Sequence, residues 1–159
     1  MKSRYEQFAS SISTIYHAIQ QIERNEMVRF GSRGVYAQYL AALHSCPEGL
    51  TAARLSELCD RDKAAVSRAV SDMEAEGLIQ REGREDTMYR AVIRLTEKGQ
   101  QAAEFVACRA SAAVEAGGRG LSPRERDTLQ AALALIAANL ETITQEGIPV
   151  SAAAGRSKP

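Results

Sequence analysis

Apolar residues recur at alternating intervals of three and four positions in two stretches, one near each end of the chain. We call the first set the N-terminal stripe: Tyr5, Phe8, Ile12, Ile15, Ile19 and Ile22. The second set is the C-terminal stripe: Leu129, Leu133, Ile136, Leu140 and Ile143. The spacing predicts two long helices, each with a narrow apolar face that packs against another helix. A complete helix-start signal, Ser122-Pro123-Arg124-Glu125, precedes the second stripe.

Shorter amphipathic segments follow the N-terminal stripe. Gly31-Ser32-Arg33-Gly34 interrupts the helical pattern, and a second helix is predicted from Val35 to about Ser45. Thr51 is a suitable N-cap for a third helix, which reaches Leu58. The side chains that we expect these two helices to bury are Val35, Tyr39, Leu40, Leu43, Ala52, Leu55 and Leu58.

The next segment continues as a helix-turn-helix. After a polar turn at residues 60–62, a helix is predicted from Lys63 to Glu76, with Asp62 as its N-cap. On a helical wheel one side of this helix is apolar and the other is small and polar. The apolar side consists of Val66, Ala69, Val70 and Met73, and the polar side of Ala64, Ser67, Arg68 and Ser71, with Lys63 and Asp72 at its edges.

The polar side of this helix suits a DNA major groove, although a plain solvated face is the alternative. Small residues allow close approach, hydroxyl groups can bond to phosphate or bases, and Arg68 could form a two-pronged bond to guanine. A β-hairpin follows, with strands that begin at Leu78-Ile79 and at Tyr89 and a polar tip at 82–88. This order of helix, turn, helix and hairpin is typical of a winged helix-turn-helix.

The predicted fold is therefore mostly α-helical with a small β-hairpin wing. We expect an N-terminal dimerisation helix (1–34), a DNA-binding lobe (35–99), C-terminal dimerisation helices (100–146) that Thr96 initiates, and a disordered tail (147–159). The two stripes offer more apolar surface than one small core requires, and a twofold DNA site requires two readers, so we expect a symmetric homodimer. The alternative is that the terminal helices pack only on each other within one chain.

Composition changes this picture only slightly. The 20 basic residues equal the 20 acidic ones, which counts mildly against nucleic-acid binding, although a local basic cluster can still face phosphate. The three cysteines, Cys46, Cys59 and Cys108, are odd in number and widely spaced, so they predict reduced thiols in a cytoplasmic protein. No apolar run is long enough for a membrane span, and the start of the chain does not resemble a signal peptide.

The segments DKAAVSRAVSDMEAEGLI and RLTEKG resemble the corresponding segments of the MarR (multiple antibiotic resistance regulator) family. The resemblance covers about residues 8–145. The resemblance implies a dimer that binds a pseudo-palindromic operator, usually as a repressor released by a small ligand or by thiol oxidation. It implies base reading by Ala64, Ser67, Arg68 and Ser71, and phosphate contact by Thr51 and Lys63. The family commonly has Asp and Arg in the wing where this chain has Thr87 and Tyr89, so Arg84 or Arg90 would have to substitute.

The resemblance also places an effector pocket between the N-terminal helices and the DNA-binding lobe. Candidate lining residues are Tyr16, His17, Arg24, Tyr36, Tyr39 and His44, although they could equally be core and interface residues. Aromatic rings with one cation would suit a small aromatic or anionic effector, such as an aromatic carboxylate.

Two other functions remain as alternatives. The acidic wing tip (Glu82, Glu85 and Asp86) and the neutral net charge would suit a winged-helix module that binds protein instead of DNA. A thiol- or zinc-responsive regulator is less favoured. Helical spacing places Cys59 on an apolar side, which predicts a buried and inert thiol, and His44 with Cys46, two residues later, makes a weak metal site. We expect neither an enzyme nor a bound cofactor, since His17 and His44 have no evident catalytic partners.

Overall fold

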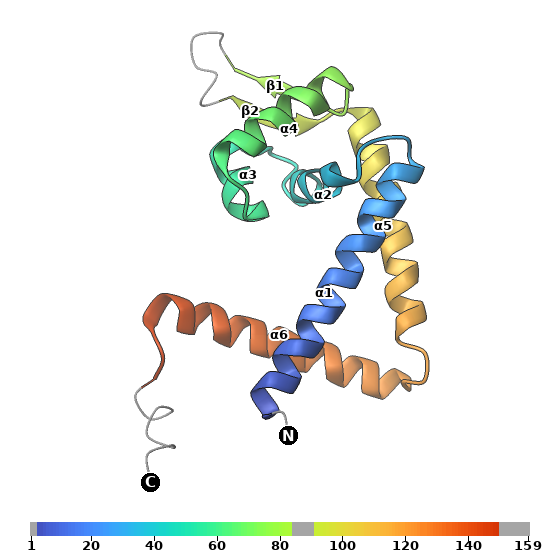
Figure 1. Ribbon diagram of the computed structural model, residues 1–159, viewed down its shortest axis with the longest axis vertical. Coiled ribbons are helices and arrows are strands. Elements are labelled where there is room, and N and C mark those ends of the chain that lie inside the picture. The colour runs from blue at the N-terminus through green and yellow to red at the C-terminus, as the bar shows by residue number, and fades with distance from the viewer. Residues whose placement is uncertain (1–2, 84–90, 150–159) are drawn as a thin grey trace. The chain divides into compact units, whose positions relative to one another are not determined.

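The computed structural model describes residues 3–83 and 91–149, which form helices and one two-stranded antiparallel hairpin (Figure 1). The elements are α1 (Arg4–Arg29), the 3-10 turn η1 (Gly34–Tyr36), α2 (Ala37–His44), α3 (Ala52–Cys59), α4 (Lys63–Ala75), β1 (Ile79–Glu82), β2 (Val92–Leu95), α5 (Glu97–Gly117) and α6 (Pro123–Glu146). They divide into two compact units, Met1–Ala116 and Gly117–Pro159. No helix in the described ranges is both long and apolar enough to cross a membrane.

The first unit contains the predicted winged helix-turn-helix, in which α2, α3, α4 and the hairpin surround one core (Figure 1). The strands pair antiparallel with Ile79 opposite Leu95 and Glu82 opposite Val92, and an isolated bridge joins Leu50 to Ile93. The residues of this core that are almost completely buried include Tyr39, Leu40, Leu55, Val66, Met73, Leu78, Ile79 and Ile93. The predicted fold class is confirmed.

Side-chain caps begin the helices where the sequence predicted them. The Thr51 hydroxyl accepts a hydrogen bond from the Arg54 amide at 3.2 Å, and the Asp62 carboxylate accepts one from the Ala65 amide at 2.8 Å. The Thr96 hydroxyl accepts from the Gly99 amide at 3.1 Å, and Ser122 forms a complete capping box with Glu125. Each cap satisfies amides that have no partner within their helix, which fixes where the helix starts.

Several details of the predicted elements are wrong. The second helix begins at Ala37, because residues 34–36 form a tighter 3-10 turn, and this turn leaves Val35 46% exposed instead of buried. Leu58 is also exposed (48%), since Leu55 fills the core from α3. Residues Ser45 and Glu76 are C-caps and lie just outside the helices assigned to them. The predicted tail lies outside the described residues from 150 onward.

The long helix α5 starts in close contact with the hairpin. A Cβ placed on Gly99 would lie 1.9 Å from the Leu78 carbonyl oxygen, so only glycine allows this approach. Farther along, α5 buries Ala102, Ala103 and Val106 with Met27 of α1 in the core. The half-exposed rings of Phe30 and Phe105 extend this contact, with centroids 5.8 Å apart. The small residues of α5 therefore serve the core of the first unit.

The two stripes remain largely uncovered in the single chain. Tyr5, Phe8, Ile12 and Ile15 of the N-terminal stripe are exposed on α1. On α6, which forms the second unit with its flanking residues, Leu129, Leu133, Ile136 and Leu140 are 36–51% exposed. The N-terminal stripe lies on α1, and the C-terminal stripe lies on α6, which begins at the predicted helix-start signal of Ser122.

Candidate nucleic-acid interface

The exposed face of α4 has the composition that its sequence predicted. Val66, Ala69, Val70 and Met73 are buried against the lobe, and this side fixes the rotation of the helix about its axis. The side chains that consequently face solvent are Lys63, Ala64, Ser67, Arg68 and Ser71. Small and hydroxylated residues around one arginine form a surface that a groove edge can approach closely.

Arg68 is the charged group at the centre of this face. Within the part of the chain that the structure describes, its guanidinium has no hydrogen bond or ion pair. It therefore keeps the donors that a guanine edge or a phosphate group would require. At the start of α4, exposed Lys63 follows the Asp62 cap, and half-buried Thr51 uses its hydroxyl as an acceptor, which leaves the hydroxyl hydrogen available to phosphate.

The hairpin arginines in the described ranges are bound to acids of the same lobe. Arg81 Nε donates to Glu74 Oε2 of α4 at 2.9 Å, and this hydrogen bond lowers the pKa of the Glu74 carboxyl. Arg94 Nε lies 3.1 Å from Glu82 Oε2 on the paired strand. These two arginines therefore brace the wing. Arg84 and Arg90, the predicted substitutes for the usual wing arginine, lie outside the described residues.

The six candidate effector-binding residues do not form one cluster. Tyr36 and Tyr39 are buried in the core. Tyr16 and His17 lie next to each other on exposed α1, with ring centroids 5.9 Å apart. Arg24 lies in α1 where Gly34 packs against its backbone, and His44 lies at the end of α2.

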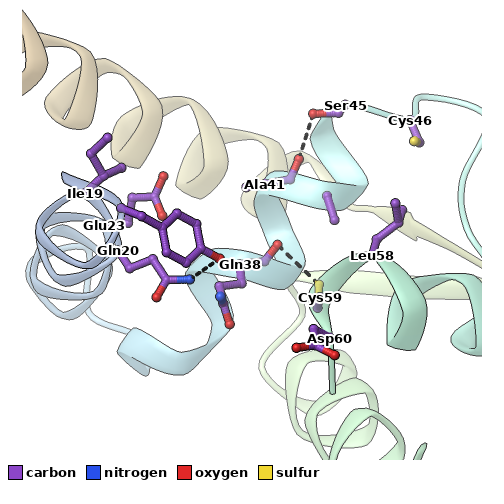
Figure 2. A pocket seen from close by; sticks show the side chains of 12 residues that line it. Ile19, Gln20, Glu23, Gln38, Ala41, Ser45, Cys46, Leu58, Cys59 and Asp60 are labelled. Carbon is purple, nitrogen blue, oxygen red and sulfur yellow. Dashed lines mark hydrogen bonds between the residues drawn. The ribbon is translucent and has the colours of Figure 1, made fainter. Parts of the chain in front are cut away.

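A hollow of about 480 Å³ opens between α1, α2 and the end of α3 (Figure 2). In Figure 2 its side chains come from α1 on one side, from α2 in the middle and from α3 on the other. The lining residues are Tyr16, Ile19, Gln20, Glu23, Gln38, Ala41, Ala42, Ser45, Cys46, Leu58, Cys59 and Asp60. Of the six candidates only Tyr16 lines it, while His44 lines a smaller hollow of about 150 Å³ that shares Glu23.

The charge of the larger hollow could not be predicted from the sequence. Its charged lining groups are the carboxyls of Glu23 and Asp60, and none of its lining residues is a lysine, arginine or histidine. Burial raises the pKa of the Glu23 carboxyl. Sequence reasoning missed Glu23 because an isolated glutamate on a helix carries no signal of a cavity that two other helices complete.

The Cys59 thiol shows no sign of activation. The Cys59 thiol donates to the Gln38 carbonyl oxygen at 3.8 Å, and its pKa is raised, chiefly by burial, although nearby Arg61 acts in the opposite direction. A raised pKa means less thiolate and a less reactive sulfur. Among the described residues no group of three or more His, Cys, Asp and Glu side chains is placed to hold a metal ion.

Comparisons with known proteins agree with this geometry. Residues 32–87 match the model of the MarR family. A MarR transcriptional regulator from Methanosarcina mazei Go1 has a TM-score of 0.74 at 23% identity, with 90% of this chain and 94% of that one covered. A putative MarR family regulator from Listeria monocytogenes, solved with a 26mer DNA, has a TM-score of 0.70 at 22% identity and covers 99% and 100%.

A third similar structure is the MepR–DNA complex from S. aureus, with a TM-score of 0.64, 20% identity and coverage of 83% of this chain and 97% of that one. Comparison with curated proteins gives no match. The winged-helix lobe thus matches the MarR-family model over residues 32–87, and the chain shares its fold with solved MarR-family regulators.

Proposed function

We propose that this chain is a MarR-family regulator: a homodimeric transcriptional repressor that binds a pseudo-palindromic site in double-stranded DNA and is released by a small ligand. The observation that carries the proposal is the outer face of α4, where Arg68, which has no partner among the described residues, lies among small and hydroxylated side chains. On the supporting side, two proteins of the same fold, from L. monocytogenes and S. aureus, were solved with DNA.

In this proposal α4 enters the major groove. Ala64, Ser67, Arg68 and Ser71 read base edges, and Thr51 and Lys63 contact phosphate on either side of the groove. Arg84 or Arg90 completes the interface from the wing. The carboxylates elsewhere on the lobe do not oppose binding as long as they face away from the phosphate backbone of the DNA.

The exposed stripes supply the reason for a homodimer. Apolar side chains that recur every three or four residues along α1 and α6 form surfaces that a second copy of the same chain can cover. A twofold dimer would present two α4 helices, which is the arrangement that a pseudo-palindromic site requires.

The hollow between α1, α2 and α3 is the place where we propose that an effector binds. Its carboxyls disfavour an anion such as the aromatic carboxylate that the sequence suggested. The ligand class that fits is a neutral or cationic aromatic compound with a hydrogen-bond donor for Glu23. Benzylamine and benzoate form a matched pair of probes, since both carry one ring and they differ in charge. Benzylamine should weaken DNA binding more than benzoate, and Glu23→Gln should remove the difference; equal effects of the two probes would reject this ligand class.

The experiment that tests the main proposal is selection of bound duplexes from a random DNA pool at two salt concentrations. A dimeric reader should enrich a palindrome with an affinity that falls steeply as salt rises. Arg68→Ala should then cost roughly 1–3 kcal/mol of binding free energy, whereas Arg119→Ala, a control outside the lobe, should cost nothing measurable. If folded, dimeric protein enriches no sequence, the module that binds protein instead of DNA becomes the better interpretation.

A further inference from the structure

The turn that follows α1 is bonded to the second half of α4. Arg33 Nη1 donates to Asp72 Oδ2 at 2.9 Å, and Arg33 Nε lies 4.0 Å from Glu76 Oε1. Asp72 lies in α4 and Glu76 is its C-cap, four residues later, so the two lie on the same side of the helix, one turn from each other. A single guanidinium therefore faces both carboxylates.

Two neighbours of Arg33 strengthen this arrangement. The Ser32 hydroxyl donates to Glu76 Oε2 at 2.6 Å, and the Tyr36 hydroxyl donates to Asp72 Oδ2 at 3.4 Å. The centroid of the Tyr36 ring lies 5.8 Å from the Arg33 guanidinium carbon, and this residue is 1% exposed, so a buried aromatic ring supports the cation. We call Ser32, Arg33, Tyr36, Asp72 and Glu76 the α4 clamp.

The ion pair between Arg33 and Asp72 is too exposed to contribute much to global stability. The Arg33 and Asp72 side chains are 64% and 48% exposed, and ion pairs in such positions contribute little free energy of folding. Its position is more informative. Asp72 borders the exposed face of α4 and follows Arg68 by four residues, which is the spacing at which oppositely charged side chains on a helix pair.

We propose that Arg33 is a positioning residue for DNA reading: by holding Asp72, it prevents that carboxylate from pairing with Arg68 and so keeps the Arg68 guanidinium free for the groove. Arg33 acts from outside the interface, through Asp72. The inference rests on the proposed DNA-binding function. It also explains why Arg68 has no partner among the described residues although a carboxylate follows it by one helical turn.

The test is a double-mutant cycle on the full-length protein, with the duplex selected from the random pool as probe. Arg33→Ala should weaken binding by roughly two- to fivefold, the size expected from competition by an exposed ion pair. Asp72→Asn removes the competitor, so Arg33→Ala should have no further effect in that background. Arg29→Ala is the matched control, because Arg29 pairs with Glu26 of its own helix and not with α4. Thermal unfolding of each variant checks that the fold is unchanged.

Two results would overturn the inference while leaving the proposed function intact. Wild-type affinity in Arg33→Ala would show that Arg68 does not depend on the clamp. A loss that persists in the Asp72→Asn background, with a salt dependence reduced by about one phosphate contact, would show that Arg33 itself touches DNA. If the wild-type protein binds no DNA at all, the proposed function fails, and this inference fails with it.

Discussion

The winged-helix lobe and the terminal helices have similar apolar periodicity but opposite burial. In the lobe, Leu55 and Met73 are completely buried, because α2, α3, α4 and the hairpin cover one another. On α1 and α6 the stripe residues Ile15 and Leu133 remain exposed in the single chain. The comparison teaches that an apolar pattern predicts only that a helix face should be buried. Whether the same chain buries that face depends on which other elements pack against it.

Truncation within the lobe should have the largest effect. Met73→Ala removes a completely buried side chain from α4, so we expect a loss of roughly 2–5 kcal/mol in the free energy of unfolding, measured with denaturant. Leu58→Ala is the control, since Leu58 is half exposed, and its loss should stay below about 1 kcal/mol. Equal losses at the two positions would contradict the contrast between the core and its surface.

A charge in a stripe should separate the proposed dimer. Leu133→Glu would place two carboxylates in a twofold interface, so we expect the dimer to weaken by roughly 3 kcal/mol or more, on the order of a hundredfold. Analytical ultracentrifugation over a range of protein concentrations measures this change. Leu135→Glu is the matched control, because Leu135 is exposed on the same helix but lies off the stripe. A dimer that tolerates both substitutions must use another surface.

Two glycines of α5 should respond differently to the same substitution. Gly99→Ala would force the start of α5 away from the Leu78 carbonyl, with an expected loss of roughly 1–3 kcal/mol in stability. Gly117→Ala, at the far end of the same helix, meets no atom within 4 Å and should be neutral or slightly stabilising. Denaturant unfolding distinguishes them, and a harmless Gly99→Ala would contradict the close packing of α5 on the hairpin.

The smallest expected effects concern two glutamates that should give opposite dependence on pH. Burial raises the pKa of the Glu23 carboxyl in the folded protein. Its ionisation therefore lowers the free energy of unfolding as the pH rises from the pKa of the unfolded chain through the higher pKa of the folded one. Glu23→Gln should accordingly stabilise the protein near neutral pH. The hydrogen bond from Arg81 lowers the pKa of Glu74, so its contribution is present at neutral pH and is lost as pH falls through the lowered folded pKa. Glu74→Gln should therefore destabilise only at the higher pH.

Unfolding curves recorded between about pH 3 and pH 7 test both substitutions. In strong acid, where both carboxyls are protonated in the folded and unfolded chain, each variant should approach the wild-type stability. Parallel pH profiles for the two variants would contradict the opposite environments of these carboxyls.

Much of the fold and of the α4 face followed from local signals. Caps at Thr51, Asp62 and Ser122 fixed helix starts, because a side-chain oxygen two or three residues from an unpaired amide acts over a short range. The exposed face of α4 was predictable because helical periodicity places Ser67 and Arg68 opposite Val70 and Met73. Val35 and Leu58 were mispredicted because the same periodicity gives no account of a tight turn or of which neighbour fills the core first.

By itself, then, the sequence determined where the capped helices start, the order of the winged helix-turn-helix and the character of its outer face, since these depend on contacts within one or two turns of chain. Only the tertiary structure decided that Arg33 binds Asp72, which lies 39 residues away, and that Glu23 faces a hollow together with Cys59. Such pairings depend on how packed helices orient their side chains. The spacing of residues along the sequence does not show which side chains from different helices come close together. For this reason the partner of each charge, and the charge of the cavity, became visible only in the folded chain.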